Sequence, residues 1–201
     1  RAIPQYPVDL LCAGRGDTVS MADLRPEHRL IADWIKAGTR VLDLGCGDGL
    51  FLEALATEKG VTGYGIEIDS DNIIACLARG VNVLQSNLDA GLSDFDENSF
   101  DYVVMTQTVQ AMRFPQRVIS EILRIGREGI VTFPNMGHWK CRWQIAKGNM
   151  PVTRHLPESW YDTPNIHMCT LKDFEVFCAE EQLDIVQRAT VDSQHRAVIG
   201  M

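Results

Sequence analysis

The residues with the clearest chemical signal follow the first strongly apolar strand pattern of the chain. Gly45, Gly47 and Gly49 come there in a G-x-G-x-G spacing, and Asp43 stands two residues before the first of them. Glycines at this spacing let the backbone turn tightly and approach a ligand, and the helix that follows offers free N–H groups to an anion. Glu67 ends the next strand pattern, where a carboxylate can accept hydrogen bonds from both hydroxyls of a ribose. Together these residues indicate a site for a nucleoside cofactor.

The glycine spacing also bears on which nucleoside the site would take. A dinucleotide fingerprint has the form G-x-G-x-x-G, spaced for a pyrophosphate over the helix N-terminus, and this loop departs from it. An acidic side chain at Asp43 would repel a pyrophosphate but suits a ligand with an ammonium group. The pattern therefore favours S-adenosylmethionine, whose amino acid end is zwitterionic and whose sulfonium is cationic. The alternative for Asp43 is a side chain that only caps the turn, as aspartate commonly does.

Strand and helix patterns alternate along the chain from residue 21 onward. We expect strands at residues 39–44, 64–68, 81–84, 102–105 and 130–133. We expect one helix that begins near residue 26 and further helices at residues 50–55, 73–77 and 118–125. This alternation is typical of a parallel sheet with right-handed crossovers, which place helices on both faces. The predicted fold class is α/β, doubly wound, with a mostly parallel, Rossmann-like sheet. In such a sheet ligands bind at the carboxyl ends of the strands, beside the point where the strand order reverses.

Composition excludes several classes of protein. The 201 residues are 45% hydrophobic, as a globular core requires, and the formal net charge of −8 argues against nucleic acid as a partner. No apolar run approaches the roughly 18 residues of a membrane span, and the start has no signal-peptide pattern, so we expect a cytoplasmic protein with no membrane partner. The six cysteines form no C-x-x-C pair, and the acidic residues at 89–97 have no regular ligand spacing. We therefore expect no metal site.

The first twenty residues differ from the rest of the chain. They contain prolines and glycines without periodicity, and Met21 then opens a regular segment. We expect residues 1–20 to be a tag or an upstream extension, and residues 21–201 to form one domain with an insertion at 135–165.

Four sequence motifs carry a family resemblance. Residues 41–49 (VLDLGCGDG) and 63–69 (GYGIEID) resemble motif I and the following acidic motif of class I S-adenosylmethionine-dependent methyltransferases. Residues 133–139 (FPNMGHW) and 160–167 (WYDTPNIH) are more distinctive. With them, the stretch from residue 31 to about residue 196 resembles the MetW family of methionine biosynthesis proteins. The resemblance implies the class I methyltransferase fold and S-adenosylmethionine as the cofactor.

The resemblance also implies roles for individual residues. Asp43 would help to hold the amino group of the methionine moiety, Glu67 would bind the ribose, and Ile68 would flank the adenine. The residues that would line the methionine moiety are Gly45, Cys46, Gly47 and Gly49.

Two further cofactor neighbours follow the third and fourth strands. Methyltransferases often place an acidic residue against the adenine amine after the third strand, and this chain has Asn87 followed by Leu88. The amide oxygen of Asn87 can still accept that hydrogen bond, although without charge. Gln107, after the fourth strand, would be another neighbour of the cofactor.

The sequence indicates the catalytic residues much less clearly than the cofactor site. Methyl transfer is an in-line displacement, so catalysis can come mostly from positioning, and a base is needed only if the nucleophile carries a proton. The sequence lacks the Asn/Asp-Pro-Pro-Tyr motif of many amino-methylating enzymes. His138, Tyr161 and His167 are the polar candidates in the segment that should cover the site. For each of them the competing interpretation is a packed or hydrogen-bonded residue of a lid.

The predicted insertion has an unusual composition. Its tryptophans and cations are Trp139, Trp143 and Trp160 with Lys140, Arg142, Lys147 and Arg154. Trp and Arg are enriched in interface hot spots, which favours a docking surface or a cover for an anionic substrate. The alternative is that the tryptophans anchor the insertion while the cations stay solvated. The family resemblance implies homoserine O-acyltransferase as the partner.

The last segment carries two further expectations. Thr170 and Asp173 form an acidic variant of the capping box at the start of a helix, and residues 183–189 read as a strand. MetW proteins continue to a final strand, so either that strand is missing here or residues 196–200 are a short substitute.

Three functions remain open at this point. The first is an S-adenosylmethionine-dependent methyltransferase acting on a small metabolite. The second is a non-catalytic subunit that senses S-adenosylmethionine and regulates the acyltransferase. The third is a nicotinamide-dependent oxidoreductase, against which the glycine spacing and Asp43 count.

Overall fold

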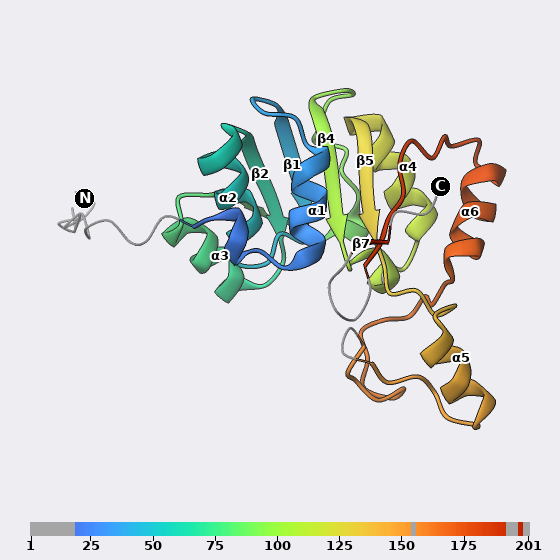
Figure 1. The fold of residues 1–201 in the computed structure, drawn as a ribbon. Helices are drawn as coiled ribbons and strands as arrows, with labels where there is room; N and C mark the ends of the chain where they lie inside the picture. The colour runs from blue at the N-terminus through green and yellow to red at the C-terminus, as the bar shows by residue number, and fades with distance from the viewer. Residues whose placement is uncertain (1–18, 154–155, 192–196, 199–201) are drawn as a thin grey trace, which may run out of the picture.

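The fold is built on one parallel sheet of five strands. The computed structural model describes residues 19–153, 156–191 and 197–198. In the sheet the strands lie in the order β3-β2-β1-β4-β5 (Figure 1). The strands are β1 (Arg40–Leu44), β2 (Thr62–Glu67), β3 (Asn82–Gln85), β4 (Phe100–Thr106) and β5 (Gly126–Thr132). Every neighbouring pair in this sheet is parallel, which confirms the predicted α/β class.

Helices cover both faces of the sheet, because the chain winds in opposite directions on the two sides of β1. The helices are α1 (Pro26–Trp34), α2 (Leu50–Lys59), α3 (Ser70–Ala78), α4 (Pro115–Ile125), α5 (Trp139–Ala146) and α6 (Leu171–Glu180). Residues of α1, α2 and α3 share one apolar cluster, and residues of α4 and α6 belong to a second cluster on the opposite face. Right-handed crossovers require this arrangement, and the winding reverses between β1 and β4.

Strand β1 shows how the pleat divides the core. Val41 packs in the cluster under α1 and α2, whereas Leu42 and Leu44 pack in the cluster under α4. Successive side chains of a strand point to opposite faces, so Asp43 shares the face of Val41. A carboxylate is thereby placed inside an apolar layer, directly before the glycine loop.

The described part of the chain begins before Met21. Val19 packs against the core, and Ser20 caps a short 3-10 helix, Met21–Asp23. Residues 1–18 of the predicted extension lie outside the described residues.

The prediction of a strand at residues 183–189 is wrong. This segment runs beside β5 without a ladder, and its apolar residues are not buried alternately: Val186 is 82% exposed. Local β-propensity is not sufficient without a paired neighbour, and the first half of β5 contains glycines and exposed charges that give little surface for packing. Instead, β6 (Thr190–Val191) pairs with β7 (Ala197–Val198) in a small separate antiparallel sheet. The main sheet thus ends at β5, and residues 192–196 and 199–201 are outside the described part.

The segment between β5 and α6 is tied at its base by one side chain. Asn135 Oδ1 accepts hydrogen bonds from Gly137 N (2.8 Å) and Leu171 N (3.2 Å), which joins the two ends of the segment. The N–H of Met136 also donates to the carbonyl of Cys169 (3.1 Å). Helix α6 begins with the predicted capping box, in which Thr170 and Asp173 bind each other's backbone N–H groups. Helix α5 therefore projects from a fixed base beyond the carboxyl end of β5 (Figure 1).

Within the residues that the structure describes, none of the helices has the length and apolar character needed to cross a lipid bilayer.

The close approach of β2 to the glycine loop gives a first testable prediction. A Cβ added at Gly65 would collide with Cys46 Sγ, so we expect Gly65→Ala to lower the free energy of unfolding by about 1–3 kcal/mol. Because removal of the Cys46 sulfur opens the same space, the double variant Gly65→Ala/Cys46→Ala should recover part of that loss in urea denaturation. Strictly additive losses in the double variant would contradict this packing account.

Candidate functional site

The candidate site lies where the sheet reverses its winding. The carboxyl ends of β1 and β4 are adjacent there, and each leads to a helix on a different face. Gly45, the first residue after β1, has φ +79°, and a Cβ on it would lie 2.9 Å from Thr108 Oγ1 in the loop after β4. The glycine loop is thus packed against the β4 loop, at the position where sheets of this type bind ligands.

Backbone hydrogen bonds hold the glycine loop against β2. The N–H groups of Gly45 and Cys46 both donate to the carbonyl of Ile66, at 2.8 and 3.1 Å. Helix α2 then begins after Gly49, which offers no side-chain cap to the first turn. A helix N-terminus with this preceding turn is suited to a negatively charged group.

The carboxylate of Glu67 reaches back from the end of β2 into the loop. Its Oε2 accepts from Gly47 N at 2.8 Å, and its Oε1 accepts from the N–H groups of Ile68 (2.8 Å) and Asp69 (3.0 Å). Oε2 retains one free lone pair, because a carboxylate oxygen accepts two hydrogen bonds. Glu67 therefore sets the shape of the loop and still has capacity for one ligand donor.

Asp43 is a buried carboxyl group without a complete set of partners. It is 2% exposed, and its Oδ1 has no hydrogen-bond partner in the described structure. Burial raises the pKa of Asp43 to about 7, while Arg25 acts to lower the pKa and Glu67 to raise it. A buried carboxylate oxygen is costly unless a donor satisfies it. The site thus presents an acceptor that suits a cationic group.

Two residues near the site were missed by the sequence reasoning. Arg25 precedes α1, and its guanidinium donates to His28 Nε2 at 2.8 Å; His28 also contacts Thr106 Oγ1 at 3.4 Å. Burial, and next the charge of Arg25, lower the pKa of His28 to about 4, so this ring is neutral at physiological pH. Position 28 falls three residues before the buried Ile31, and this helical spacing could have placed it on the inner face.

The sulfur of Cys46 is packed inside the loop and not presented to a ligand. It lies 3.8 Å from Cys76 Sγ, and the Cys76 thiol donates to the carbonyl of Gly47 at 3.1 Å. Burial raises the pKa of both thiols, so each stays protonated and unreactive. Cys46 accordingly contributes packing, and its backbone N–H holds the loop against β2.

Arg79 fastens the outer side of the loop. Its guanidinium donates to the Asp48 carbonyl (3.0 Å), to Asp48 Oδ2 (3.0 Å) and to Glu53 Oε2 (2.9 Å). These bonds connect the end of α3 to the glycine loop and to α2.

The three residues predicted to lie near the adenine have different surroundings. Ile68 is 60% exposed at the carboxyl end of β2, as an apolar side chain open to a ligand would be. Asn87 uses its Oδ1 to accept from Asp89 N at 3.0 Å, where it caps a 3-10 turn, Leu88–Ala90. Leu88 is 8% exposed and packs in the core cluster under α4. Of these three residues, Leu88 is buried, whereas Ile68 and Asn87 are exposed.

Gln107 occupies a strained position at the end of β4. It has φ +49°, and its N–H donates to both the carbonyl (3.1 Å) and the hydroxyl (3.0 Å) of Thr132. The buried Gln110 donates through its side-chain nitrogen to the Gln107 carbonyl at 2.8 Å. A left-handed residue held this firmly is typical of functional sites.

The three polar candidates for catalysis are not gathered around the glycine loop. His138 caps α5, where its Nδ1 accepts from Lys140 N at 3.3 Å. Tyr161 is 75% exposed and packs edge-on against Trp160. His167 is exposed, and its backbone N–H donates to the carbonyl of Gln110 at 2.9 Å. His167 alone is linked to the site, through Gln110 and Gln107.

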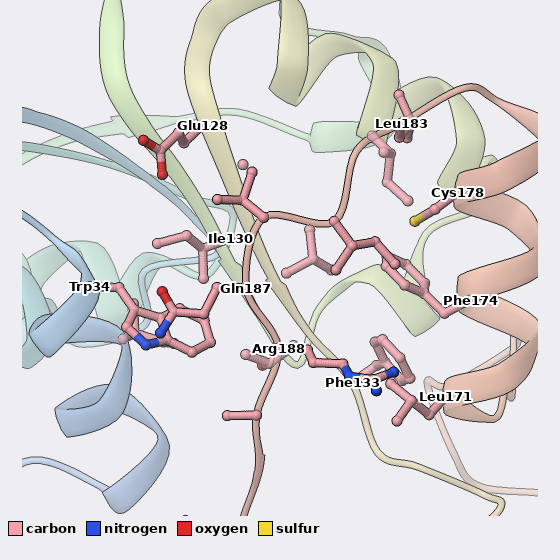
Figure 2. Close-up of a pocket in the computed structure, with 18 of the residues that line it drawn as sticks. Trp34, Glu128, Ile130, Phe133, Leu171, Phe174, Cys178, Leu183, Gln187 and Arg188 are labelled. Carbon is pink, nitrogen blue, oxygen red and sulfur yellow. The ribbon is translucent and has the colours of Figure 1, made fainter. Parts of the chain in front are cut away.

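A cavity of about 560 Å³ opens beside the site and runs along β5. Its walls come from α1, α4, β5, α6 and the segment 183–191, and Gln107 lines it at the carboxyl end of β4. Figure 2 shows Trp34 on one side and Phe174 with Cys178 on the other, with the chain through Gln187 and Arg188 between them. The lining is largely apolar, so the cavity suits a small, mostly apolar molecule.

Comparison with known proteins assigns the chain to a family. The model of the family described as "Methionine biosynthesis protein MetW" matches residues 25–201. The chain belongs to the MetW family. This MetW-family chain is 32% identical over 160 residues to the bifunctional methionine biosynthesis protein MetXA/MetW of Rhodopirellula baltica; the match covers 75% of the chain and 26% of that relative.

Other similar proteins are methyltransferases. Phosphatidylethanolamine N-methyltransferase of Cereibacter sphaeroides is 33% identical over 112 residues, which cover 52% of this MetW-family chain and 53% of that enzyme. The chain thus spans about a quarter to a half of the length of these curated relatives. A SAM-dependent methyltransferase of Thermotoga maritima shares the fold at 16% identity, with a TM-score of 0.63 over 91% of this chain and 84% of its own. The fold is therefore that of the Rossmann-like methyltransferases.

The burial of Asp43 predicts an unusual dependence of stability on pH. A raised pKa means that the folded protein holds the proton more tightly than the unfolded chain, so the contribution of Asp43 to stability falls as pH rises from about 4 to about 7. We expect Asp43→Asn to be more stable than the parent protein by about 1–3 kcal/mol at pH 8, and by much less at pH 4.5. Urea denaturation at both pH values measures this. An Asn variant that is less stable at pH 8 would show that Asp43 is fully satisfied in the fold.

Proposed function

We propose that this chain binds S-adenosylmethionine in the crevice between the carboxyl ends of β1 and β4. The observation that carries the proposal is the buried Oδ1 of Asp43, which has no partner among the described residues and lies beneath the glycine loop. A zwitterionic amino acid end fits this site, since its ammonium group supplies the missing donor. The similarity to a named methyltransferase and the fold shared with a SAM-dependent methyltransferase support this cofactor.

Different residues at this end of the sheet would contact different parts of the cofactor. Asp43 would hold the ammonium group, and the backbone of the loop from Gly45 to Gly49 would line the methionine moiety. The free lone pair on Glu67 Oε2 would accept from a ribose hydroxyl, and the exposed Ile68 would flank the adenine. Arg25 lies close enough to influence Asp43 and offers a cation for the carboxylate at the same end. When bound, S-adenosylmethionine supplies a methyl group activated by a sulfonium.

We further propose that the chain serves methionine biosynthesis as an S-adenosylmethionine-responsive partner of homoserine O-acyltransferase. The name of the bifunctional MetXA/MetW relative joins two methionine biosynthesis proteins in one chain, which supports association of the two activities. The placement of His138 as a helix cap and of Tyr161 at the surface favours a sensor over a catalyst. A cofactor made from the end product of the pathway is a suitable signal for controlling an early step.

The second candidate function is methyl transfer to a small metabolite. The cavity along β5 favours it, because Gln107, at the carboxyl end of β4, lines that cavity and the volume suits a small molecule. Positioning of the acceptor by the cavity wall could supply most of the catalysis. His167, which is held through Gln110, is the residue best placed to serve an acceptor that must lose a proton.

Calorimetric titration with S-adenosylmethionine and S-adenosylhomocysteine tests the proposed cofactor. We expect binding that is about fivefold to tenfold tighter at pH 7.5 than at pH 6, because protonation of Asp43 near pH 7 removes the negative charge that would attract the ammonium group. The lowered pKa of His28 keeps that ring neutral throughout this range. Asp43→Asn should bind more weakly and with little pH dependence. Absence of binding at either pH would refute the proposed cofactor.

The same titration separates the two candidate functions when the acyltransferase is added. A sensor should bind the cofactor with an affinity that changes in the presence of the acyltransferase, and acyltransferase activity should change with the cofactor. A methyltransferase should convert S-adenosylmethionine to S-adenosylhomocysteine when given a small-molecule acceptor. Turnover without any effect on the acyltransferase would favour the second function.

Variants at Glu67 test the ribose contact apart from the support of the loop. We expect Glu67→Ala to weaken S-adenosylmethionine binding by about 1–3 kcal/mol, because both the loop N–H groups and the ribose lose an acceptor. Glu67→Gln keeps one oxygen acceptor and should lose less. As a control, Glu58→Ala removes a carboxylate whose bond to Met21 N lies outside the crevice. Equal affinities for the parent and the Ala variant would contradict the assignment of Glu67.

A further inference from the structure

Helix α5 presents an aromatic stripe to solvent. Trp139, Arg142, Trp143 and Ala146 follow the i, i+3, i+4, i+7 spacing of one helix face, and together they line a shallow hollow. Trp139 is 66% exposed and Trp143 is 59% exposed, whereas Cys141, on the inner side of the helix, is 4% exposed. Two large indole rings on one exposed stripe are unusual for a surface that faces only water.

Cations lie over these rings. Lys140 Nζ is 5.7 Å from the centroid of the Trp139 ring, and Lys147 Nζ is 4.9 Å from that of Trp143. Within the described part of the chain, no carboxylate pairs with Lys140, Arg142 or Lys147. The sequence contains no Asp or Glu between Glu128 and Glu158, although the whole chain has a net charge of −8. We define the α5 surface as Trp139, Lys140, Arg142, Trp143 and Lys147.

Hydrogen bonds hold the base of this segment together. Asn135 Oδ1 binds both ends of the segment, and Gln144 exchanges side-chain hydrogen bonds with the backbone of Val152. A surface held in this way loses little conformational entropy when a partner binds. It also lies away from α2 and α3, on the β5 side of the molecule (Figure 1).

We propose that the α5 surface is the docking surface for a protein partner that presents carboxylates around an apolar pocket. Trp and Arg at the centre of an exposed patch are the side chains that dominate protein interfaces, and the unpaired cations call for an acidic partner. This inference rests on the proposed association with homoserine O-acyltransferase, and it assigns the place of contact. A membrane is a poorer match, because an interfacial helix separates its apolar and charged faces, whereas Arg142 lies within the aromatic stripe.

The test measures binding of the purified 201-residue chain to purified homoserine O-acyltransferase of the same source. We expect the double variant Trp139→Ala/Trp143→Ala to bind about tenfold or more weakly. The charge-reversal variant Lys140→Glu/Lys147→Glu should also bind more weakly, and the affinity of the parent chain should fall as salt increases. The matched control is Ile74→Ala/Leu77→Ala, which removes two exposed apolar side chains from α3, 64% and 62% exposed. Its affinity should equal that of the parent.

Each outcome has a distinct meaning. S-adenosylmethionine affinity and thermal unfolding show whether each variant keeps its fold. If the tryptophan variant does not fold, the charge-reversal variant provides the test. If the parent binds the acyltransferase and both α5 variants bind equally well, the docking inference is overturned while the proposed association stands. If the parent does not bind the acyltransferase, both fail. If the α5 surface instead mediates binding to vesicles of anionic phospholipid, and not to the acyltransferase, the membrane replaces the protein partner.

Discussion

A carboxyl group buried in an apolar layer is the constraint around which this structure is organised. The pleat of β1 turns Asp43 towards α1 and α2, and the same pleat turns Leu42 and Leu44 towards α4. A chain selected only for stability would place an apolar residue there, because burial raises the pKa of Asp43 and leaves Oδ1 without a donor. A carboxyl group at this position makes physical sense if a cationic group of a ligand supplies the donor that Oδ1 lacks. The destabilisation and the proposed binding are thus two consequences of one residue.

The residues around Asp43 keep the loop above it in one shape. Glu67 binds the loop from β2, Arg79 binds it from the end of α3, and the sulfurs of Cys46 and Cys76 fill the space beneath it. That filling is the reason why Gly65 cannot carry a side chain. Such a loop needs little reorganisation on binding, so more of the contact energy is available for affinity. The neutral state of His28 also favours a preformed site, because a positively charged ring would be repelled by Arg25.

The parts that sequence predicts well are those encoded by local patterns. Strand β1, the glycine loop, Glu67 and the Thr170 capping box each depend on residues close together in the chain, and each lies where it is expected. The failures concern long-range pairing. Residues 183–189 have a strand-like composition but no ladder partner among the described residues. Arg25 lies near enough to lower the pKa of Asp43 because α1 packs on the same face of the sheet, and no spacing in the sequence encodes that proximity.

The fold separates two kinds of recognition along the carboxyl edge of the sheet. The carboxylates of Asp43 and Glu67 at the ends of β1 and β2 are buried, whereas the α5 surface beyond β5 is exposed, aromatic and basic. The cavity along β5 lies between them and is bounded by residues of β5 and α6, the two elements that Asn135 connects to the base of α5. A change at the crevice that moved Gln107 would reach this base through Thr132, because Gln107 binds Thr132 and Asn135 follows three residues later. Coupling between a ligand site and a docking surface requires a contiguous set of contacts of this kind.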